Sequence, residues 1–542
     1  MFMIKKRIVN FIFYLTSFSF LPAQVYFEAD PFYLLSYEKS FFEEDQQTNP
    51  LIYRPTFKIG SSDKDRWSFK FRTEFFRNDN APNLENTSVR WIGKGDSHYR
   101  SMSLSFVGEH IAFSLEPYYF TNQNLDYEVP VRKGIYTRMN DTRPHGDSLL
   151  VSSGMREVQF YLHHRGFGFG VSNASMWWGP GLHSSLQMST NAPGFRHFVI
   201  GTLEEKRIRN LGFDLRYMFS HFDEKNAGEP YFSALLVSTT FYSEPQMTIG
   251  ISRSYLSGHG TLSPTGPYTI SKKDAMLLPF EGLYLESKQT DPEDPESAVD
   301  LWDEIMVGYV TATFPSSGLK IYLSYGRDDH AWDKKDFLRQ PDHSAASVIG
   351  LRKYGLFGHE NLVGGLEYVN LIKSKFWNKR VPGTWYSKQV YDYNSYNGRW
   401  YGAHSGPDSD DFTIYLGYMS DKFSIVPSFN YERHGVIDNT ALVLMKRPYL
   451  VFDPETGQWY PEIREEYMES VVNIWPEVKF EFRLDVRFEV RNFRFNLYYE
   501  KEKVDNLEFN WGKRKGHVIW FGVERTFTEF KLSNPLKRFI KR

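Results

Sequence analysis

The chain contains no cysteine among its 542 residues. Folding therefore cannot depend on disulfide bonds, and the same absence excludes a thiolate metal site and the lipid anchor of a lipoprotein. Charges of the two signs are nearly balanced, with 64 Lys and Arg against 66 Asp and Glu. Because there is no basic surplus, we expect no nucleic-acid partner.

Long apolar runs are missing after the N-terminus, so the sequence offers no transmembrane helix, and any passage through a membrane must use strands. Residues 1–23 differ from the rest. Basic residues at positions 5–7 precede the apolar stretch Ile8–Leu21, and small Ala23 follows. This order predicts a signal peptide cut before Gln24, because an uncleaved signal anchor would need a longer apolar stretch.

Aromatic residues are abundant, with 46 Phe, 35 Tyr and 13 Trp, although the mean hydropathy is only -0.49. A wall that is apolar outside and polar inside, with aromatic girdles at the two membrane interfaces, has this composition. The composition therefore favours a transmembrane β-barrel.

Apolar and charged residues alternate strictly along Phe480–Val490, and the parity reverses after Arg491 and Asn492. Such a reversal predicts two antiparallel strands joined by a tight turn. The same alternation recurs in Trp67–Phe75, Met102–Phe106, Ile111–Leu115, Leu211–Tyr217, Leu319–Tyr325 and Phe412–Tyr418. A large soluble sandwich or propeller is the alternative, but alternation throughout an exported chain is typical of a barrel.

We therefore predict an all-β protein, an antiparallel transmembrane β-barrel over residues 61–530 in the outer membrane of a Gram-negative-type cell. About 470 residues, at about 25 residues per strand and connection, give roughly 16 to 20 strands. The last strand is expected near His517–Phe527, before a basic tail at 531–542. Residues 24–60 have no clear period and are interpreted as a periplasmic segment or a plug. Long extracellular loops are expected at His259–Leu301, Lys373–Asp411 and His434–Val471.

Residues Ser175–Phe195 read SMWWGPGLHSSLQMSTNAPGF and resemble the signature segment of the capsule assembly Wzi family of outer-membrane proteins. The matching positions are Trp177, Trp178, Gly179, Pro180, Gly181, Ser185, Leu186, Ser189, Asn191 and Ala192. A second stretch, from Tyr396 to Asp408, resembles a later motif of the same family.

The resemblance implies a barrel of about 18 strands that binds surface polysaccharide as a lectin. Some family members carry a periplasmic helical bundle near the N-terminus. Residues 24–60 are short and weakly helical, so no such bundle is expected here.

Trp177 and Trp178 offer flat faces for sugar rings beside the turn Gly179-Pro180-Gly181. Polar neighbours that could serve the sugar hydroxyls are His183, Ser185 and Asn191. The alternative is that the tryptophans belong to the interfacial girdle or to packing in the lumen, with the glycines making a sharp bend.

Arg399, His404 and Asp408 lie in a second polar, glycine-rich stretch and are further candidates for polysaccharide binding, with a solvated loop as the alternative. Asp328 and the acidic and imidazole groups that follow it lack the spacing of a calcium loop, so no metal site is expected. We expect no cofactor and no enzyme activity, because neither a G-x-S-x-G elbow nor an H-E-x-x-H pair is present.

Two main functions fit these observations. The first is a non-enzymatic, monomeric barrel that binds surface polysaccharide, capsule or exopolysaccharide, in contact with outer-membrane lipid and the polysaccharide export machinery. The second is a diffusion porin or transporter, in which luminal charges such as Arg483, Arg487 and Glu489 would select solutes. A plugged lumen favours the first function, and an open charged constriction favours the second.

Overall fold

The computed structural model describes residues 26–528. The gaps lie at 28, 30, 45–48, 60–65, 143–147, 224–227, 259–269, 282–287, 292–293, 301, 329–337, 339–340, 375–382, 387–391, 393, 437–443, 455 and 468–474. The predicted signal peptide and the basic tail lie outside the described residues.

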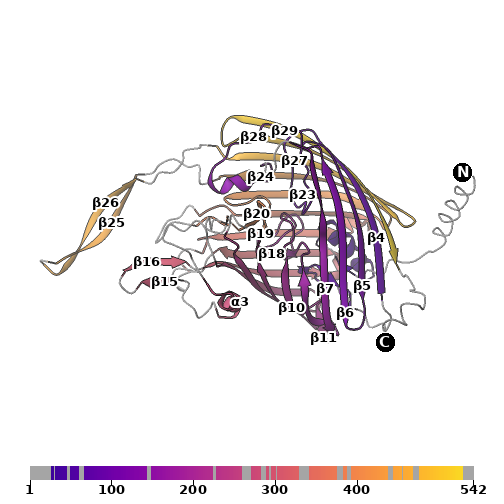
Figure 1. Ribbon diagram of the computed structural model, residues 1–542, viewed down its shortest axis with the longest axis horizontal. Helices are drawn as coiled ribbons and strands as arrows, with labels where there is room; N and C mark the ends of the chain where they lie inside the picture. Colours follow the sequence, from indigo (N-terminus) through magenta and orange to yellow (C-terminus); the bar gives the residue numbers. More distant parts are fainter. Residues whose placement is uncertain are drawn as a thin grey trace, which may run out of the picture.

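A closed antiparallel barrel forms the body of the protein (Figure 1). Within the described residues it has 18 strands, because β10 and β11 both pair with β12 and together make one strand. The last strand, β29, pairs with the first, β4, and closes the barrel. The strands are β4 (Arg66–Asn78), β5 (Gly95–Val107), β6 (Ile111–Asn122), β7 (Leu150–His164), β8 (Phe167–Ser172), β10 (His197–Thr202) with β11 (Lys206–Ile208), β12 (Leu211–His221), β13 (Tyr231–Phe241), β14 (Gln246–Ser257), β17 (Trp302–Phe314), β18 (Leu319–Asp328), β19 (Ala345–Tyr354), β20 (Leu362–Asn370), β23 (Ser409–Met419), β24 (Phe423–His434), β27 (Glu477–Val490), β28 (Phe493–Leu507) and β29 (Gly512–Thr528). The predicted fold class is confirmed.

The alternation in the sequence becomes the two faces of the barrel wall. In β27, Phe482 is 45% exposed on the outer face, whereas Glu481 and Asp485 on the inner face are 5% and 4% exposed. Val490 pairs with Phe493 across the two-residue turn predicted from the change in parity. Apolar side chains thus face the lipid and charged ones face the lumen, as a period of two requires.

The two ends of the barrel differ in their connections. Short turns, such as the one at residues 491–492, join the strands at the end where β4 begins and β29 ends. The long connections lie at the other end and include helix α3 (Lys272–Glu281), the hairpin β15 (Lys288–Asp291) with β16 (Asp294–Asp300), and the hairpin β25 (Leu444–Asp453) with β26 (Gln458–Tyr467) (Figure 1). In outer-membrane barrels the short turns face the periplasm and the long loops face outward.

Residues 26–59 contain β1 (Tyr26–Phe27), helix α2 (Pro31–Glu44), β2 (Tyr53–Arg54) and β3 (Thr56–Phe57). This segment lies against the inner face of the wall. Glu38 accepts hydrogen bonds from Lys320 and Arg352, at 2.7 and 3.0 Å, and the Tyr53 hydroxyl lies 2.9 Å from the carbonyl oxygen of Val237. No helix in the described part of the chain is long and apolar enough to cross a membrane.

Three of the connections at the long-loop end also pack inside the barrel. They comprise residues 79–94 between β4 and β5, residues 173–196 between β8 and β10, and residues 395–408 before β23. Together with the described residues of 26–59 we call them the luminal core. This core occupies the interior that a barrel of this size would otherwise leave to water.

Candidate functional site

The two sequence motifs meet in the luminal core. Asn191 donates a hydrogen bond to the Trp400 carbonyl oxygen at 2.9 Å, and the backbone N–H of Ser189 donates to the Tyr401 carbonyl oxygen at 2.7 Å. The rings of His183 and His404 lie 4.5 Å apart, centre to centre. Segments separated by about 200 residues therefore form one structural unit inside the barrel.

Trp177 and Trp178 form the short strand β9 (Trp177–Trp178), which pairs with β2. Their exposed fractions are 0% and 2%, so neither ring offers a face to solvent or to lipid. The girdle alternative is therefore wrong for this pair. On a strand of the wall, only one of two neighbouring side chains could face the lumen. Strand β9 lies inside the lumen instead, so both tryptophan side chains are buried.

The turn at Gly179-Pro180-Gly181 is held by the carboxylate of Glu367, an inward-facing residue of β20. This carboxylate accepts hydrogen bonds from the backbone N–H groups of Leu182 and Ser184, both at 2.7 Å, and of His183 at 3.2 Å. Gly179 has φ +105°, and a Cβ atom there would lie 2.8 Å from the Tyr309 ring. The turn needs glycine both for its backbone conformation and for its close approach to the wall.

Most of the other predicted site residues bind the protein itself. Ser185 donates a hydrogen bond to the Trp178 carbonyl oxygen. Arg399 is buried, donating to Thr87 Oγ1 at 3.0 Å and to the Ser88 carbonyl oxygen. Asp408 accepts a hydrogen bond from the Lys373 N–H at 3.2 Å. All three side chains are buried, so none of them lies on a solvated loop.

His183 and His404 share a carboxylate that was not among the predicted site residues. Asp411 Oδ2, at the beginning of β23, lies 3.1 Å from His183 Nε2 and 3.3 Å from His404 Nε2. Burial alone would lower the pKa of His183, but the charge of Asp411 outweighs burial and raises this pKa to about 9.

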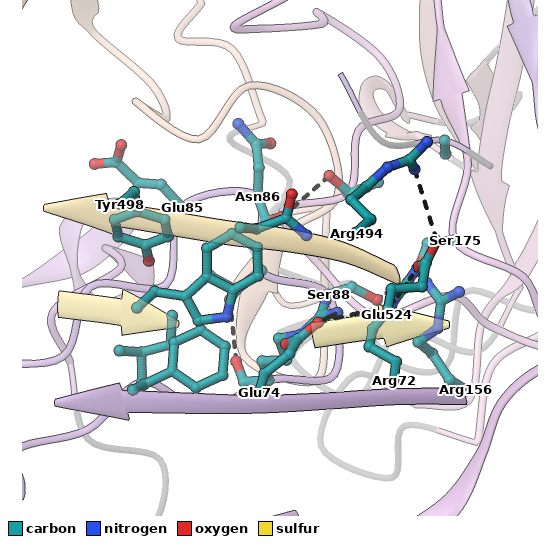
Figure 2. A pocket seen from close by; sticks show the side chains of 18 of the residues that line it. Arg72, Glu74, Glu85, Asn86, Ser88, Arg156, Ser175, Arg494, Tyr498 and Glu524 are labelled. Atoms are coloured by element: carbon teal, nitrogen blue, oxygen red, sulfur yellow. Dashed lines mark hydrogen bonds and ion pairs between the residues drawn. The ribbon is translucent and has the colours of Figure 1, made fainter. Parts of the chain in front are cut away.

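A cavity of about 210 Å³ separates the luminal core from the wall strands β4, β27, β28 and β29 (Figure 2). Its lining has seven basic and four acidic side chains: Lys70, Arg72, Arg90, Arg156, Arg483, Arg487 and Arg494, with Glu74, Glu85, Glu157 and Glu524. Ser175 and Thr190 of the signature segment also line it. The cavity extends toward the short-turn end, because Arg487 and Arg494 flank the turn at 491–492.

Ion pairs hold the cavity arginines in place. Arg72 lies 2.8 Å from Glu524, Arg90 lies 2.6 Å from Glu74, and Arg494 Nη2 lies 2.7 Å from Glu489. Figure 2 shows Arg72, Arg494 and Glu524 gathered on one side of the cavity. Fixed guanidinium groups beside one another are suited to carboxylate or phosphate ligands, which they bind through paired N–H donors.

Some of these residues could be assigned to the lumen from the sequence alone. Arg483 and Arg487 stand on the charged face of the clearest strand pattern, as does Arg72 in its own strand, so their inward direction follows from the alternation. Glu85 and Asp411 carry no such signal, because their importance depends on which loops fold inward. Asp328 is not exposed as a loop residue would be, and it accepts a hydrogen bond from the Tyr386 N–H at 2.8 Å.

Comparisons with known proteins agree with this architecture. Residues 78–515 match the capsule assembly protein Wzi family. Among solved structures, the chain is similar to the Escherichia coli outer-membrane protein Wzi, described as a carbohydrate-binding β-barrel involved in group 1 capsule assembly. The identity is 13%, the TM-score is 0.51, and the similarity covers 84% of each chain.

More distant similarities reach outer-membrane proteins of other kinds. Pseudomonas aeruginosa OpdK is 9% identical with a TM-score of 0.40, covering 86% of this chain and 99% of its own. Acinetobacter baumannii OccAB2 is 10% identical with a TM-score of 0.41, and the similarity covers 86% of this chain and 99% of OccAB2. No curated protein matches significantly. Since the family match spans most of the chain and the fold is the corresponding barrel, this outer-membrane protein belongs to the capsule assembly protein Wzi family.

Proposed function

We propose that this protein binds an acidic surface polysaccharide, without catalysis, and thereby helps to assemble or retain it at the outer membrane. The observation that carries the proposal is the arginine-rich cavity beside the signature segment. Family membership supports the polysaccharide as the class of ligand.

Acidic sugars supply the groups that this cavity could bind. A carboxylate can accept two parallel hydrogen bonds from one guanidinium, which is stronger and more directional than a bond between neutral groups. Arg487 and Arg494 would supply such bonds, while Asn496 and Ser175 in the same lining would serve sugar hydroxyls. Each sugar would bind weakly, and repeated units along the polymer would raise the overall affinity.

The filled lumen favours this function over a diffusion porin. The four segments of the luminal core occupy the interior, and their largest fully buried side chains include Trp177, Trp178 and Trp400. A porin of this size keeps a water-filled passage instead.

Deletion of the gene tests the proposal. Polysaccharide bound to the cells and polysaccharide shed into the medium would be measured separately, so that loss of assembly is distinguished from loss of retention. Restoration with the intact protein should return the bound fraction to normal, and a protein carrying both Arg487→Gln and Arg494→Gln should not.

Arg77→Gln is the matched control, because the Arg77 side chain is 69% exposed and lies outside the cavity. Trp178→Ala is unsuitable here, since the buried ring supports the core and its loss would disturb folding. Unchanged polysaccharide together with altered uptake of small solutes would contradict the proposal and favour the porin.

A further inference from the structure

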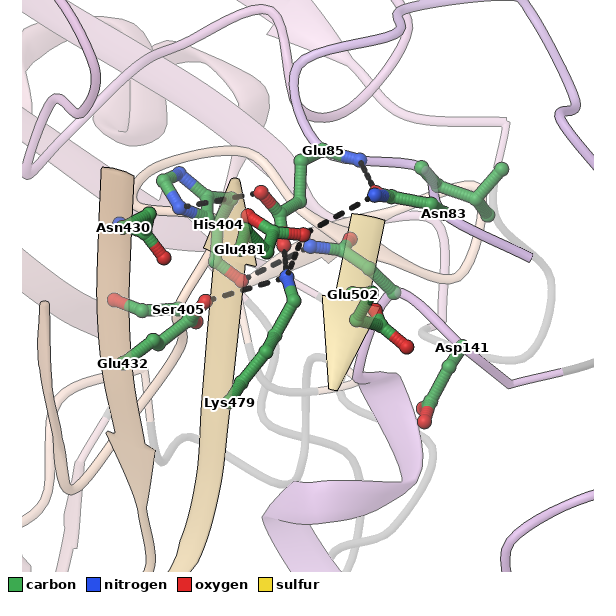
Figure 3. A network of polar contacts seen from close by, with 12 residues as sticks. Asn83, Glu85, Asp141, His404, Ser405, Asn430, Glu432, Lys479, Glu481 and Glu502 are labelled. Carbon is green, nitrogen blue, oxygen red and sulfur yellow. Dashed lines mark hydrogen bonds and ion pairs between the residues drawn. The ribbon is translucent and has the colours of Figure 1, made fainter. Parts of the chain in front are cut away.

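Three side chains with metal-binding atoms converge inside the barrel, apart from the arginine-rich cavity that carries the proposed function. They are His183 from residues 173–196, His404 from residues 395–408 and Asp411 from β23. Figure 3 shows His404 beside Glu85, and the Lys479 ammonium contacts Glu85. We call His183, His404 and Asp411 the His–His–Asp cluster.

The spacing of the donor atoms suits a tetrahedral ion. Zinc bonds of about 2.0 to 2.2 Å place neighbouring ligand atoms about 3.3 to 3.6 Å apart. Asp411 Oδ2 lies 3.1 Å from His183 Nε2 and 3.3 Å from His404 Nε2, and all three donor atoms lie within 4.8 Å of one another. These atoms are therefore already close to the positions that a bound ion requires.

Several of these atoms make no hydrogen bond among the described residues. Neither ring nitrogen of His404 makes one, and neither does Asp411 Oδ2, which has the two imidazoles beside it. Both residues are deeply buried, at 2% and 1% exposure. Because a buried polar atom without a hydrogen bond costs free energy, the two ring nitrogens of His404 indicate a ligand there.

The surrounding charges favour this cluster over a second possible donor set. His404, Glu85 and Glu432 form that second set, but the Lys479 ammonium contacts Glu85 and lies 3.4 Å from Glu432, and it would repel a cation there. At the His–His–Asp cluster, the Asn430 amide donates a hydrogen bond to Asp411 Oδ1, which leaves Oδ2 directed at the histidines, and it also lies 3.1 Å from His183 Nε2. A second residue that orients a ligating carboxylate is a regular feature of metal sites.

We propose that His183, His404 and Asp411 bind a divalent transition-metal ion of the zinc class and leave its fourth coordination position open. Two imidazoles with a carboxylate suit such an ion better than calcium or magnesium, which prefer oxygen ligands. The ion would tie two inward-folded segments to β23 and fix the core that forms one side of the arginine-rich cavity. The His183 side chain retains 22% exposure and provides a route of entry.

No metal site is expected from the sequence, because the donors stand at positions 183, 404 and 411 and form no local motif. Imidazole binds a metal only when it is neutral, so an ion and a proton compete for His183.

The experiment uses the purified full-length protein in detergent, stripped with chelator and titrated with Zn²⁺ and, separately, with Co²⁺. We expect one ion per chain, and the visible absorption of tetrahedral Co²⁺ that Zn²⁺ abolishes. His404→Gln should weaken binding by more than about 100-fold, and Asn430→Ala, which removes only the supporting amide, by about 10- to 100-fold. His197→Gln is the matched control, because His197 is another buried luminal histidine and lies outside the cluster.

The intact protein provides a test that does not depend on the folding of any variant. Failure of the intact protein to bind Zn²⁺ or Co²⁺ would overturn the proposal, and so would tight binding that His404→Gln leaves unchanged. Neither result bears on polysaccharide binding, because the metal proposal does not rest on the proposed function.

Discussion

The barrel wall and the luminal core obey different rules of construction. In the wall, apolar side chains such as Ile349 and Leu416, 48% and 52% exposed, alternate with inward polar ones. In the core, aromatic rings and charged groups are buried together, and partners such as His183 and Asp411 come from distant parts of the chain. The wall is therefore specified locally, and the core is specified by which loops fold inward.

This difference separates the tasks of the two regions. The wall must satisfy its backbone hydrogen bonds and present an apolar surface to lipid, which a period of two achieves with many residue types. The core must place particular side chains at particular distances. Single substitutions in the core should therefore destabilise the protein more than substitutions in the wall. The following predictions test this contrast in order of decreasing expected effect.

Trp178→Ala should destabilise the protein most. The ring is 2% exposed and packs near Phe232, with centroids 6.2 Å apart, so its loss leaves a cavity. We expect the free energy of unfolding to fall by about 3 to 5 kcal/mol, as measured by urea unfolding in detergent or lipid. Trp459→Ala is the control, because Trp459 is 64% exposed and should lose little. Equal losses for the two variants would contradict the packing described for the core.

Ile349→Arg places a charge on the lipid face near the middle of β19. Such a substitution should lower the free energy of unfolding by about 2 to 4 kcal/mol at the membrane midplane and by much less near an interface. Phe357→Arg supplies that comparison, since Phe357 is 83% exposed in a short turn. Unfolding in lipid vesicles measures both costs, and a larger loss for Phe357→Arg would reverse the assigned depth of the two residues.

Acid should loosen α2 from the wall. Burial alone would raise the pKa of Glu38, but Arg352 and Lys320 together lower it to about 2. A carboxylate with a lowered pKa stabilises the folded state above its unfolded value, near 4.5, and this contribution is lost as the pH falls from 4.5 toward 2. Hydrogen exchange of residues 31–44 should rise in that window. Glu38→Gln should raise exchange at neutral pH and remove most of the change in this window, and an unaltered profile would contradict the assignment.

Arg77→Ala should have the smallest effect. Its side chain is 69% exposed, and its ion pair with Asp96 is 3.9 Å long. Exposed pairs contribute about 0 to 1 kcal/mol. A loss above that range, in the same unfolding assay, would mean that the outer end of β4 has a structural role that the contacts do not show.

Much of the wall could be predicted from sequence, because alternation in Trp67–Phe75 or Phe480–Val490 depends only on neighbouring residues. The turn at Arg491 and Asn492 followed from the same pattern. The core was harder to predict. Motif residues such as Trp178 and Arg399 were recognised, but their burial against β2 and residues 79–94 depends on contacts that no local pattern encodes.

The candidate site divides in the same way. Arg483 and Arg487 could be assigned to the lumen from their strand, although not to a shared cavity with Arg156 from β7. Asp411 and Glu85 could not be selected at all, since each is one acidic residue among 66 until the fold places it beside His404. Polar groups from different elements become a site only through the tertiary structure.

Direct binding of polysaccharide by the purified protein tests whether the arginine-rich cavity binds acidic polymers. Hyaluronan would serve as the uronate-containing polymer and dextran as the neutral one, each titrated at low and high salt. The intact protein should bind hyaluronan, more weakly at high salt, and should not bind dextran. The double variant Arg487→Gln with Arg494→Gln should bind hyaluronan about 10-fold or more weakly, because each charge-assisted hydrogen bond contributes about 1.5 to 3 kcal/mol. Binding of hyaluronan that the double variant leaves unchanged, or equal binding of both polymers, would contradict the account.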